Sequence, residues 1–390
     1  MSDRSICVVT GTRAEYGLLQ SPMEHIKATE DLQLQVVATG MHLSPRYGNT
    51  YEEIEADGFD IDRKIDMLID ADSGFSMAKS TGIGMMGLAE AFRDLAPDIV
   101  LILGDRDEPL AAGIAAAHMN IPVAHIHGGD VMVGAIIDDS IRYALTKFAH
   151  IHFPASDASA ERISRLGEEE WRIHVAGAPG VDAIIANEYE PPDEVREVLG
   201  IDPDQKIVLC VQHPVTTQPD QAGRQMQITL DAIEPLDAQT VLIYPNSDAG
   251  GKEMIETIEN HPSRDEILVF KNLSRSRYLG LMDAADVMVG NSSSGIIEAP
   301  SFDLPAVDIG LREQRRQRAP STKSVDHDRE EIRRAVEAEL YDEERKQEAK
   351  SCENPYDYGG QANRLRSSSG CNYRRPSAAE EYYLLRVISG

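Results

Sequence analysis

Basic residues and long hydrophobic runs are both scarce in this sequence. Its 390 residues contain 38 Lys and Arg against 66 Asp and Glu, which gives a formal net charge of −28. A nucleic-acid-binding protein needs a basic surface to neutralise phosphates, so this balance excludes a nucleic-acid partner and disfavours an anionic membrane. The longest apolar runs fall far short of the ~20 residues that span a bilayer, and no signal-peptide segment is present. We therefore expect a cytoplasmic protein without a membrane partner.

Lysine and cysteine are also rare. There are 10 Lys against 28 Arg. Acid-rich surfaces with little lysine suit proteins that stay soluble in concentrated salt, so we hypothesise a halophilic protein, with an ordinary acidic protein as the alternative. The four cysteines stand alone, without any C-x-x-C pair, which argues against a disulfide framework or a structural zinc site. They are Cys7, Cys210, Cys352 and Cys371.

Short β-branched runs alternate with longer amphipathic segments along most of the chain. Strands this apolar are buried on both faces, which is typical of a parallel sheet covered by helices. The pattern occurs twice and predicts an α/β fold with two doubly wound, Rossmann-like domains facing a cleft. The expected strands are residues 6–10, 34–39, 99–103, 123–126, 151–153, 207–211, 240–244, 267–270, 287–289 and 306–309.

A polar segment with a proline pair, residues 187–193, separates the two series of strands. We therefore predict an N-terminal domain over 1–188 and a C-terminal domain over 189–366. The composition shifts after residue 366 towards serine and arginine, so residues 367–390 are expected to be a divergent tail.

Polar clusters follow the predicted strands almost without exception. In open α/β sheets, ligands bind in the crevice outside the carboxyl ends of the strands, so these clusters should line one cleft. The clusters begin at Thr10, Gly40, Gly104, His127, Gln212, Pro245 and Gly290.

The segment 290–295, GNSSSG, is the strongest phosphate-binding candidate. Small residues let backbone N–H groups approach an anion at a helix N-terminus, and serine hydroxyls add donors. The alternative is a serine N-cap in an ordinary turn. Arg13 could hold a phosphate through two hydrogen bonds, or could simply pair with Glu15 at the start of a helix.

A G-x-G-x-x-G pattern at Gly82, Gly84 and Gly87 does not follow a predicted strand, because residues 71–81 are polar and broken. The dinucleotide fingerprint requires a strand, a turn and a helix, so NAD is not expected. No other cofactor is indicated.

Carboxylates and histidines gather just beyond the strand ends of the first half. They suit acid–base chemistry, but they lack tight metal-ligand spacing, so no metal is expected. Alternatively, Asp138 and Asp139 could cap a helix, and Asp105 could bridge to Arg106 within a turn. The candidates are Asp105, His127, Asp130 and Asp138, joined by His213 from the second half.

In this order, the motifs resemble the hydrolysing UDP-N-acetylglucosamine 2-epimerases of sialic- and legionaminic-acid pathways. The resemblance implies a glycosyltransferase-B-like fold and the conversion of UDP-GlcNAc and water to N-acetylmannosamine and UDP, through a 2-acetamidoglucal. It also implies a homodimer or homotetramer. The matching segments are GTRAEYG (11–17), GDR (104–106), HIHGG (125–129), DDSIRYALTK (138–147), QHPVTT (212–217), PNSDAGG (245–251), GNSSSGIIEAPSF (290–302) and NPYDYGG (354–360).

The resemblance also implies residue roles. Asp105, Asp138 and His213 would be catalytic, while Glu298 would bind the ribose hydroxyls and Arg312 would complete the nucleotide site. Further substrate contacts are expected from Arg13, Arg106, Ser292, Ser293, Asn246 and Asp248.

Two positions depart from the pattern of the family, since many members carry glutamate at or beside His127 and Asp130. These two residues stay catalytic candidates, although Asp130 is shorter than Glu by one methylene. Three alternatives therefore remain open. The substrate could be a UDP-2,4-diacetamido-trideoxyhexose or another nucleotide sugar, or the protein could be a glycosyltransferase or a non-catalytic nucleotide-sugar binder.

Overall fold

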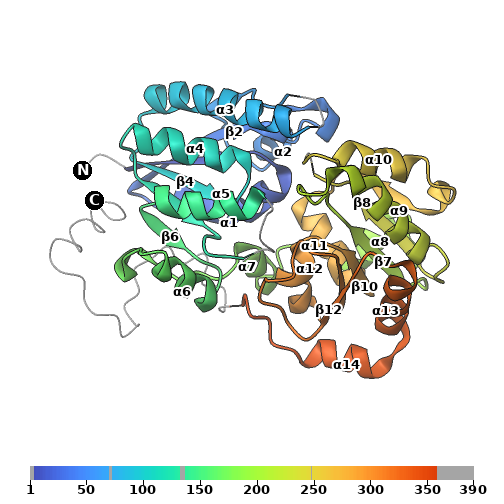
Figure 1. The fold of residues 1–390 in the computed structure, drawn as a ribbon. Coiled ribbons are helices and arrows are strands. Elements are labelled where there is room, and N and C mark those ends of the chain that lie inside the picture. The colour runs from blue at the N-terminus through green and yellow to red at the C-terminus, as the bar shows by residue number, and fades with distance from the viewer. Residues whose placement is uncertain (1–3, 70–72, 132–136, 247, 358–390) are drawn as a thin grey trace.

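Two parallel six-stranded sheets form the framework of the molecule (Figure 1). The computed structural model describes residues 4–69, 73–131, 137–246 and 248–357. The first sheet has the order β3-β2-β1-β4-β5-β6 and the second β12-β11-β10-β7-β8-β9. Their strands are β1 (Arg4–Thr10), β2 (Leu32–Thr39), β3 (Arg63–Ile65), β4 (Ile99–Leu103), β5 (Val123–Ile126), β6 (Ile151–Phe153), β7 (Ile207–Val211), β8 (Gln239–Ile243), β9 (Leu268–Phe270), β10 (Val287–Gly290), β11 (Ala306–Ile309) and β12 (Thr322–Val325).

The predicted α/β fold and all ten predicted strands are confirmed, with ends that differ by at most two residues. Central strands such as β4 are buried along their whole length, which explains their continuous apolar sequences. The prediction missed β3 and β12, which lie at the sheet edges. These two edge strands are short and polar, so they carry no apolar run to read.

Helices cover both faces of each sheet (Figure 1). In the first half, α3, α4 and α5 bury one face, while α1 and α2 bury the other. In the second half, α9, α10 and α13 cover one face, while α8 and α11 lie on the other. The helices are α1 (Arg13–Ala28), α2 (Tyr51–Ala56), α3 (Gly74–Leu95), α4 (Asp107–His118), α5 (Ile137–Phe148), α6 (Asp157–Arg165), α7 (Pro179–Ile185), α8 (Pro192–Leu199), α9 (Ala222–Ile233), α10 (Gly251–Glu259), α11 (Arg275–Ala284), α12 (Ser294–Ile297), α13 (Arg329–Tyr341) and α14 (Glu343–Ser351).

The G-x-G-x-x-G pattern lies inside α3. The expectation of a broken segment before it was wrong, because Ser73 caps the helix through a reciprocal capping box with Ser76 and α3 runs from Gly74. The three glycines are therefore helical and do not form a strand-to-helix phosphate loop.

The chain crosses between the halves at α7 and α8. Helix α7 packs against α1, whereas α8 packs against α11. Tyr356 returns to the junction and is buried against apolar side chains of both halves, including Ala178 and Ile296. The division at residues 188 and 189 remains our proposal, and the expected tail over 367–390 lies outside the described residues. Among those described, no helix has the length and apolar character needed to cross a bilayer.

Candidate active site

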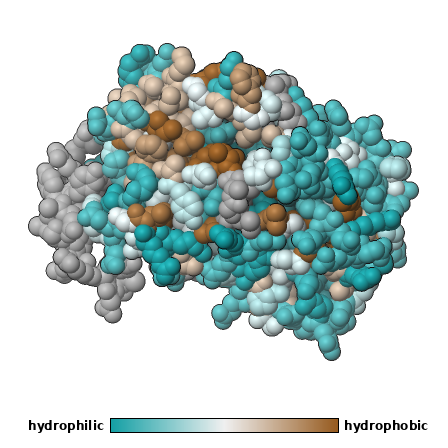
Figure 2. All heavy atoms as spheres, in the orientation of Figure 1, coloured by the Kyte–Doolittle hydropathy of each residue, from teal (hydrophilic) through white to brown (hydrophobic). Residues whose placement is uncertain are grey.

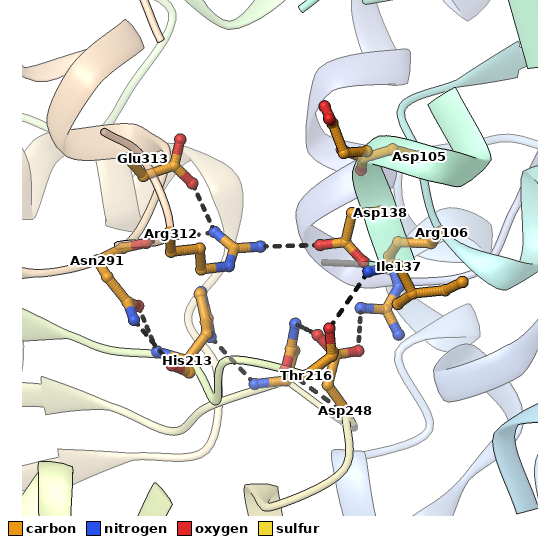
Figure 3. A network of polar contacts seen from close by, with 12 residues as sticks. Asp105, Arg106, Ile137, Asp138, His213, Thr216, Asp248, Asn291, Arg312 and Glu313 are labelled. Carbon is orange, nitrogen blue, oxygen red and sulfur yellow. Dashed lines mark hydrogen bonds and ion pairs between the residues drawn. The ribbon is translucent and has the colours of Figure 1, made fainter. Parts of the chain in front are cut away.

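The two halves meet through reciprocal ion pairs at the carboxyl ends of their strands (Figure 3). Arg106 of the first half donates from Nη1 to Oδ1 of Asp248 at 3.0 Å. Conversely, Arg312 of the second half places Nη2 3.5 Å from Oδ2 of Asp138. Each half thus supplies one arginine and one carboxylate, and each arginine holds the carboxylate of the other half.

Arg106 owes its position to a tight turn after a strand. Gly104, with φ +82°, ends β4 and turns the chain so that Arg106 stands directly before α4. The guanidinium also has Nε 3.4 Å from Oε2 of buried Glu108. Burial alone would raise the pKa of Asp248, but Arg106 and then Arg312 outweigh it and lower that pKa. Asp248 is therefore held ionised.

Asp138 titrates in the opposite direction. It lies in the first turn of α5 and is buried, as is its neighbour Asp139, so neither acts as the N-cap that the alternative interpretation suggested. Burial raises the pKa of Asp138 to about 6, the charge of Asp248 adds to this, and Arg312 partly offsets it. Two facing carboxylates with pKa values pushed apart are a common arrangement in acid–base catalysis.

His213 is fixed in a single neutral tautomer. It follows β7, and its backbone N–H donates to Asn291 Oδ1 at 2.6 Å, while Asn291 Nδ2 donates to its carbonyl at 2.9 Å. The backbone N–H of Asn246 donates to its Nδ1 at 3.1 Å, which leaves Nε2 carrying the proton. Burial lowers the pKa of His213 to about 3, and Arg312 reinforces the effect. The ring is therefore a neutral hydrogen-bond donor.

Asp105 turns away from this group of residues (Figure 3). Its carboxylate pairs with the buried guanidinium of Arg142 from α5. Because Arg106 pairs with Asp248 and Glu108, the interpretation of an Asp105–Arg106 bridge within the turn was wrong. Asp105 keeps a half-buried position at the end of β4.

The carboxylate of Asp130 also contacts the second half. It accepts a hydrogen bond from Ser159 Oγ at 2.7 Å, and its Oδ2 lies 3.3 Å from Nε of Arg316. His127, in the left-handed region with φ +65°, is buried at the same turn. Burial lowers the pKa of His127, and Asp130 opposes this shift. His127 and Asp130, the two positions that depart from the family pattern, thus lie where the ion pair between Asp130 and Arg316 joins the two halves.

The predicted nucleotide-binding residues have protein partners of their own. Arg13 donates from Nε to Glu53 at 2.7 Å, which corrects the suggested pairing with Glu15; Glu15 instead accepts the N–H of Gly11 at 2.7 Å. Glu298 pairs with Arg275 on α11.

Ser292 and Ser293 lie at the start of α12. Ser293 occupies the cap position without making a side-chain cap hydrogen bond, so the alternative of an ordinary serine N-cap was wrong. The Oγ atom of Ser292 is 3.4 Å from the backbone N–H of Ser294, which donates to it. These hydroxyls remain candidates for the diphosphate.

Several residues at this site went unrecognised in the sequence. Thr216 accepts the N–H of Ile137 at 3.4 Å across the two halves, and it belongs to the QHPVTT motif that was quoted without assigning it a role. Glu313 is fully buried and contacts both Arg312 and Arg316. The arginine-rich segment 312–318 was the signal that could have revealed them. Arg142 lies in the quoted DDSIRYALTK motif but was given no role, and Arg275 had no such signal.

Comparison with known proteins identifies the relatives of this chain. The sequence profile described as UDP-N-acetylglucosamine 2-epimerase matches residues 24–368. The chain belongs to this family. The UDP-N,N′-diacetylbacillosamine 2-epimerase (hydrolyzing) of Legionella pneumophila is 42% identical over 83% of this chain and 85% of its own. A GDP/UDP-N,N′-diacetylbacillosamine 2-epimerase (hydrolyzing) of Campylobacter jejuni is 37% identical, covering 82% and 83%.

More distant members share the architecture. The UDP-N-acetylglucosamine 2-epimerase of Neisseria meningitidis is 30% identical over 86% of this chain and 87% of its own. A solved UDP-GlcNAc 2-epimerase from Neisseria meningitidis, bound to UDP-GlcNAc, superposes with a TM-score of 0.76 at 17% identity, covering 93% and 98% of the two chains. The UDP-GlcNAc 2-epimerase of Methanocaldococcus jannaschii, in complex with UDP-GlcNAc and UDP, gives 0.76 at 20% identity with the same coverage. These superpositions confirm the glycosyltransferase-B-like fold.

Proposed function

We propose that this protein is a hydrolysing 2-epimerase that converts a UDP-linked 2-acetamido sugar and water into UDP and the free C2-epimeric sugar. The observation that carries the proposal is the reciprocal pairing of Arg106 with Asp248 and of Arg312 with Asp138, beside the neutral His213. Acid, base and cationic groups from both halves thereby converge where α/β sheets bind ligands.

Inversion at C2 requires loss of a poorly acidic proton. The proton becomes removable as the C1–O bond to UDP breaks and cation character develops at C1. Asp138 accepts it, because its raised pKa makes a buried carboxylate a stronger base that is still ionised at neutral pH. The C–H electron pair forms the double bond of a 2-acetamidoglucal, and the C1–O pair leaves with UDP.

The leaving diphosphate needs compensation for its charge. Arg312, which pairs with Asp138, supplies a cation, and the Nε2–H of His213 supplies a neutral donor. Ser292 and Ser293 add hydroxyl donors from the start of α12. Water then adds its hydroxyl to C1 and its proton to C2 from the opposite face, which gives the manno configuration. Asp105 and Asp130 are the further carboxylates proposed for this second step.

Similarity favours a UDP-2,4-diacetamido-trideoxyhexose as the sugar substrate. The relatives at 42% and 37% identity are named as diacetylbacillosamine 2-epimerases, whereas the relative at 30% is named for UDP-GlcNAc. We therefore propose UDP-N,N′-diacetylbacillosamine as the first substrate to test. UDP-GlcNAc, to which the motifs point equally well, is the second.

Incubation with each nucleotide sugar in D2O, without any acceptor, tests the proposal. We expect free UDP and a 2-epimeric sugar with one deuterium at C2, and H2(18)O should label the C1 oxygen. Protium at C2 in the product would refute the elimination. Turnover only on addition of an acceptor would indicate a glycosyltransferase, and binding without turnover would indicate a nucleotide-sugar binder.

A matched pair of variants tests the base. Asp138→Asn should lower turnover about 100-fold or more while UDP binding survives, because it removes a positioned proton acceptor. Asp139→Asn changes the neighbouring buried acid, whose Oδ1 lies 3.4 Å from Arg142 and which does not pair with Arg312. Equal losses of turnover in the two variants would contradict the assignment of Asp138.

A further inference from the structure

Two glutamates, Glu15 and Glu108, are buried beside the candidate active site. The surface over the second half is mostly hydrophilic (Figure 2), as expected for a chain with a net charge of −28. In contrast to such solvated groups, Glu15 is only 6% exposed and Glu108 only 3%. Acidic side chains are almost never buried unless they are paired, so the burial of these two requires a physical reason.

Both side chains meet at Gly11, the first residue after β1. Glu15 lies in the first turn of α1, and its Oε2 accepts the backbone N–H of Gly11 at 2.7 Å. Glu108 lies in the first turn of α4, and a Cβ at Gly11 would lie only 2.4 Å from its Cγ. A Cβ at Gly40, directly after β2, would lie 2.5 Å from Oε1 of Glu108. The ends of the neighbouring strands β2, β1 and β4 therefore enclose one site that holds two carboxyl groups.

This site suits one negative charge and not two. Two carboxylates that share a dry site repel each other, so one of them retains a proton. Burial raises the pKa of Glu15 to about 8, and the charge of Glu108 adds to the shift, which the hydrogen bond from Gly11 and then Arg106 partly offset. Oε1 of Glu15 is buried and makes no hydrogen bond within the described part of the chain. An ionised oxygen there would be costly, so Glu15 is the neutral acid at neutral pH.

Glu108 faces Arg106, a member of the candidate active site. Its Oε2 lies 3.4 Å from Nε of Arg106, while Nη1 of the same guanidinium donates to Asp248 at 3.0 Å. Burial alone would lower the pKa of Arg106, but Glu108 and then Asp248 outweigh it and raise that pKa. Because the guanidinium is planar, one partner at Nε and another at Nη1 fix both its place and its plane. Glu108 belongs to the same half as Arg106, so its hold does not depend on the second half.

We propose that Glu108 is a positioning residue for Arg106, and that Glu15 carries the single proton of the two adjoining carboxyl groups. Arg106 is expected to contact the substrate, so this role rests on the proposed function. With Glu15 neutral, Glu108 can stay ionised and attract the guanidinium. Held at Nε, Arg106 keeps Nη1 directed towards Asp248 and the cleft, where an oxygen of the nucleotide sugar can accept a hydrogen bond (Figure 3).

An amide substitution at each glutamate separates the two roles. Glutamine matches the shape of a neutral glutamic acid, so Glu15→Gln should leave kcat/KM at pH 7 nearly unchanged. Glu108→Gln removes the charge that holds Arg106, so kcat/KM should fall about 10-fold or more, because displacing a substrate-positioning group is costly. Glu339→Gln is the matched control. Glu339 is 2% exposed on α13 and accepts from Arg345 at 2.6 Å, so the same change of a buried, arginine-paired glutamate should leave kcat/KM unaffected.

A double variant shows whether Glu108 acts through Arg106. Arg106→Gln removes the charge that Glu108 holds, so adding Glu108→Gln to it should cause no further loss of kcat/KM. A purely structural contribution of Glu108 would instead reduce activity by the same factor in both backgrounds. That additive result would overturn the positioning role.

Infrared spectra detect the proton on Glu15 without any turnover. Near pH 7, the difference between the wild-type and Glu15→Gln spectra should contain the C=O band of a neutral carboxylic acid. A difference that contains only the bands of an ionised carboxylate would overturn the proposal, as would equal losses of kcat/KM in Glu15→Gln and Glu108→Gln. A wild-type protein that turns over no nucleotide sugar would contradict the proposed function and the positioning role with it, whereas the infrared band would still decide where the proton lies.

Discussion

Arg312 and Asp138 face each other from opposite halves of the molecule, with 3.5 Å between Nη2 and Oδ2. Arg312 also donates to buried Glu313 at 2.7 Å, so it serves two carboxylates at once. Asp138 consequently keeps a raised pKa despite its cationic partner. A carboxylate in this state is ionised at neutral pH and still a competent base.

The pH dependence of turnover should follow Asp138. A base works only when deprotonated, so kcat/KM should be constant above about pH 6 and fall as the pH drops through that value. Asp248→Asn removes the neighbouring negative charge that helps to raise this pKa, so the acid limb should move to lower pH. Steady-state kinetics between about pH 4.5 and 8 measure the shift. If the acid side of the profile does not move in Asp248→Asn, the group that titrates there is not Asp138.

Asp138→Asn should stabilise the folded protein at pH 7.5. The folded pKa of Asp138 is raised above the ordinary value of 3.8, so the folded state binds more protons than the unfolded chain between the two values. The contribution of Asp138 to stability is full below about 3.8 and is lost as the pH rises through about 6. Thermal melts should show the variant a few degrees higher at pH 7.5, with the gap closing near pH 4. A lower melting temperature at pH 7.5 would contradict the assigned shift.

Asp105→Asn should lower stability as well as activity. It deprives Arg142, which is only 1% exposed, of a charged partner. Breaking a buried pair costs about 3–5 kcal/mol, and the 20% exposure of the Asp105 side chain reduces this to roughly 1–3 kcal/mol. Urea unfolding measures the loss. Combining Asp105→Asn with Arg142→Met should recover part of it, and an equally unstable double variant would count against the pairing.

Nucleotide affinity should depend on Glu298, Ser292 and Ser293. Replacing both serines by alanine should weaken UDP binding by roughly 0.5–1.5 kcal/mol for each lost hydrogen bond. Glu298→Ala should also weaken it, if the ribose hydroxyls share this carboxylate with Arg275. Calorimetry with UDP is the measurement, and Asp139→Asn is the control. Unchanged affinity in both sets would place the nucleotide elsewhere.

Salt should stabilise the protein strongly. A chain with net charge −28 repels itself, and ions screen that repulsion between exposed groups. The melting temperature should therefore rise between about 0.1 M and about 2 M KCl by more than for a protein of ordinary charge. A melting temperature that stays constant or falls with increasing KCl would contradict the halophilic hypothesis.

The fold was predictable because buried parallel strands have a strong signature. The continuous apolar sequences of β4 and β7 give their positions within a residue, and the polar turns that follow them give the face where ligands bind. The first part of helix α3 was missed, because residues 71–81 read as polar and broken and the glycines that follow imitate a loop. The local pattern of hydrophobic residues does not show whether an apolar helix face is covered by the rest of the chain or remains exposed.

The sequence was enough to predict which residues gather at the candidate site, but not which carboxylate pairs with which arginine. Asp138, Asp248, Arg106, Arg312 and His213 were all named from motifs, and the structure brings them together. Which acid faces which arginine depends on how two halves close, over sequence separations of 142 residues for Arg106 and Asp248. The buried partners Arg142 and Glu313 went unassigned, since burial is a property of tertiary packing.

The crossed pairs tie the raised pKa of the proposed base Asp138 to contact between the two halves. When the halves separate, Arg106 loses Asp248 and Arg312 loses Asp138, and all four groups meet water. The pKa of Asp138 then falls towards its ordinary value, because the desolvation that raised it is gone. In the proposed reaction, Asp138 is therefore a strong base only while the two halves are in contact.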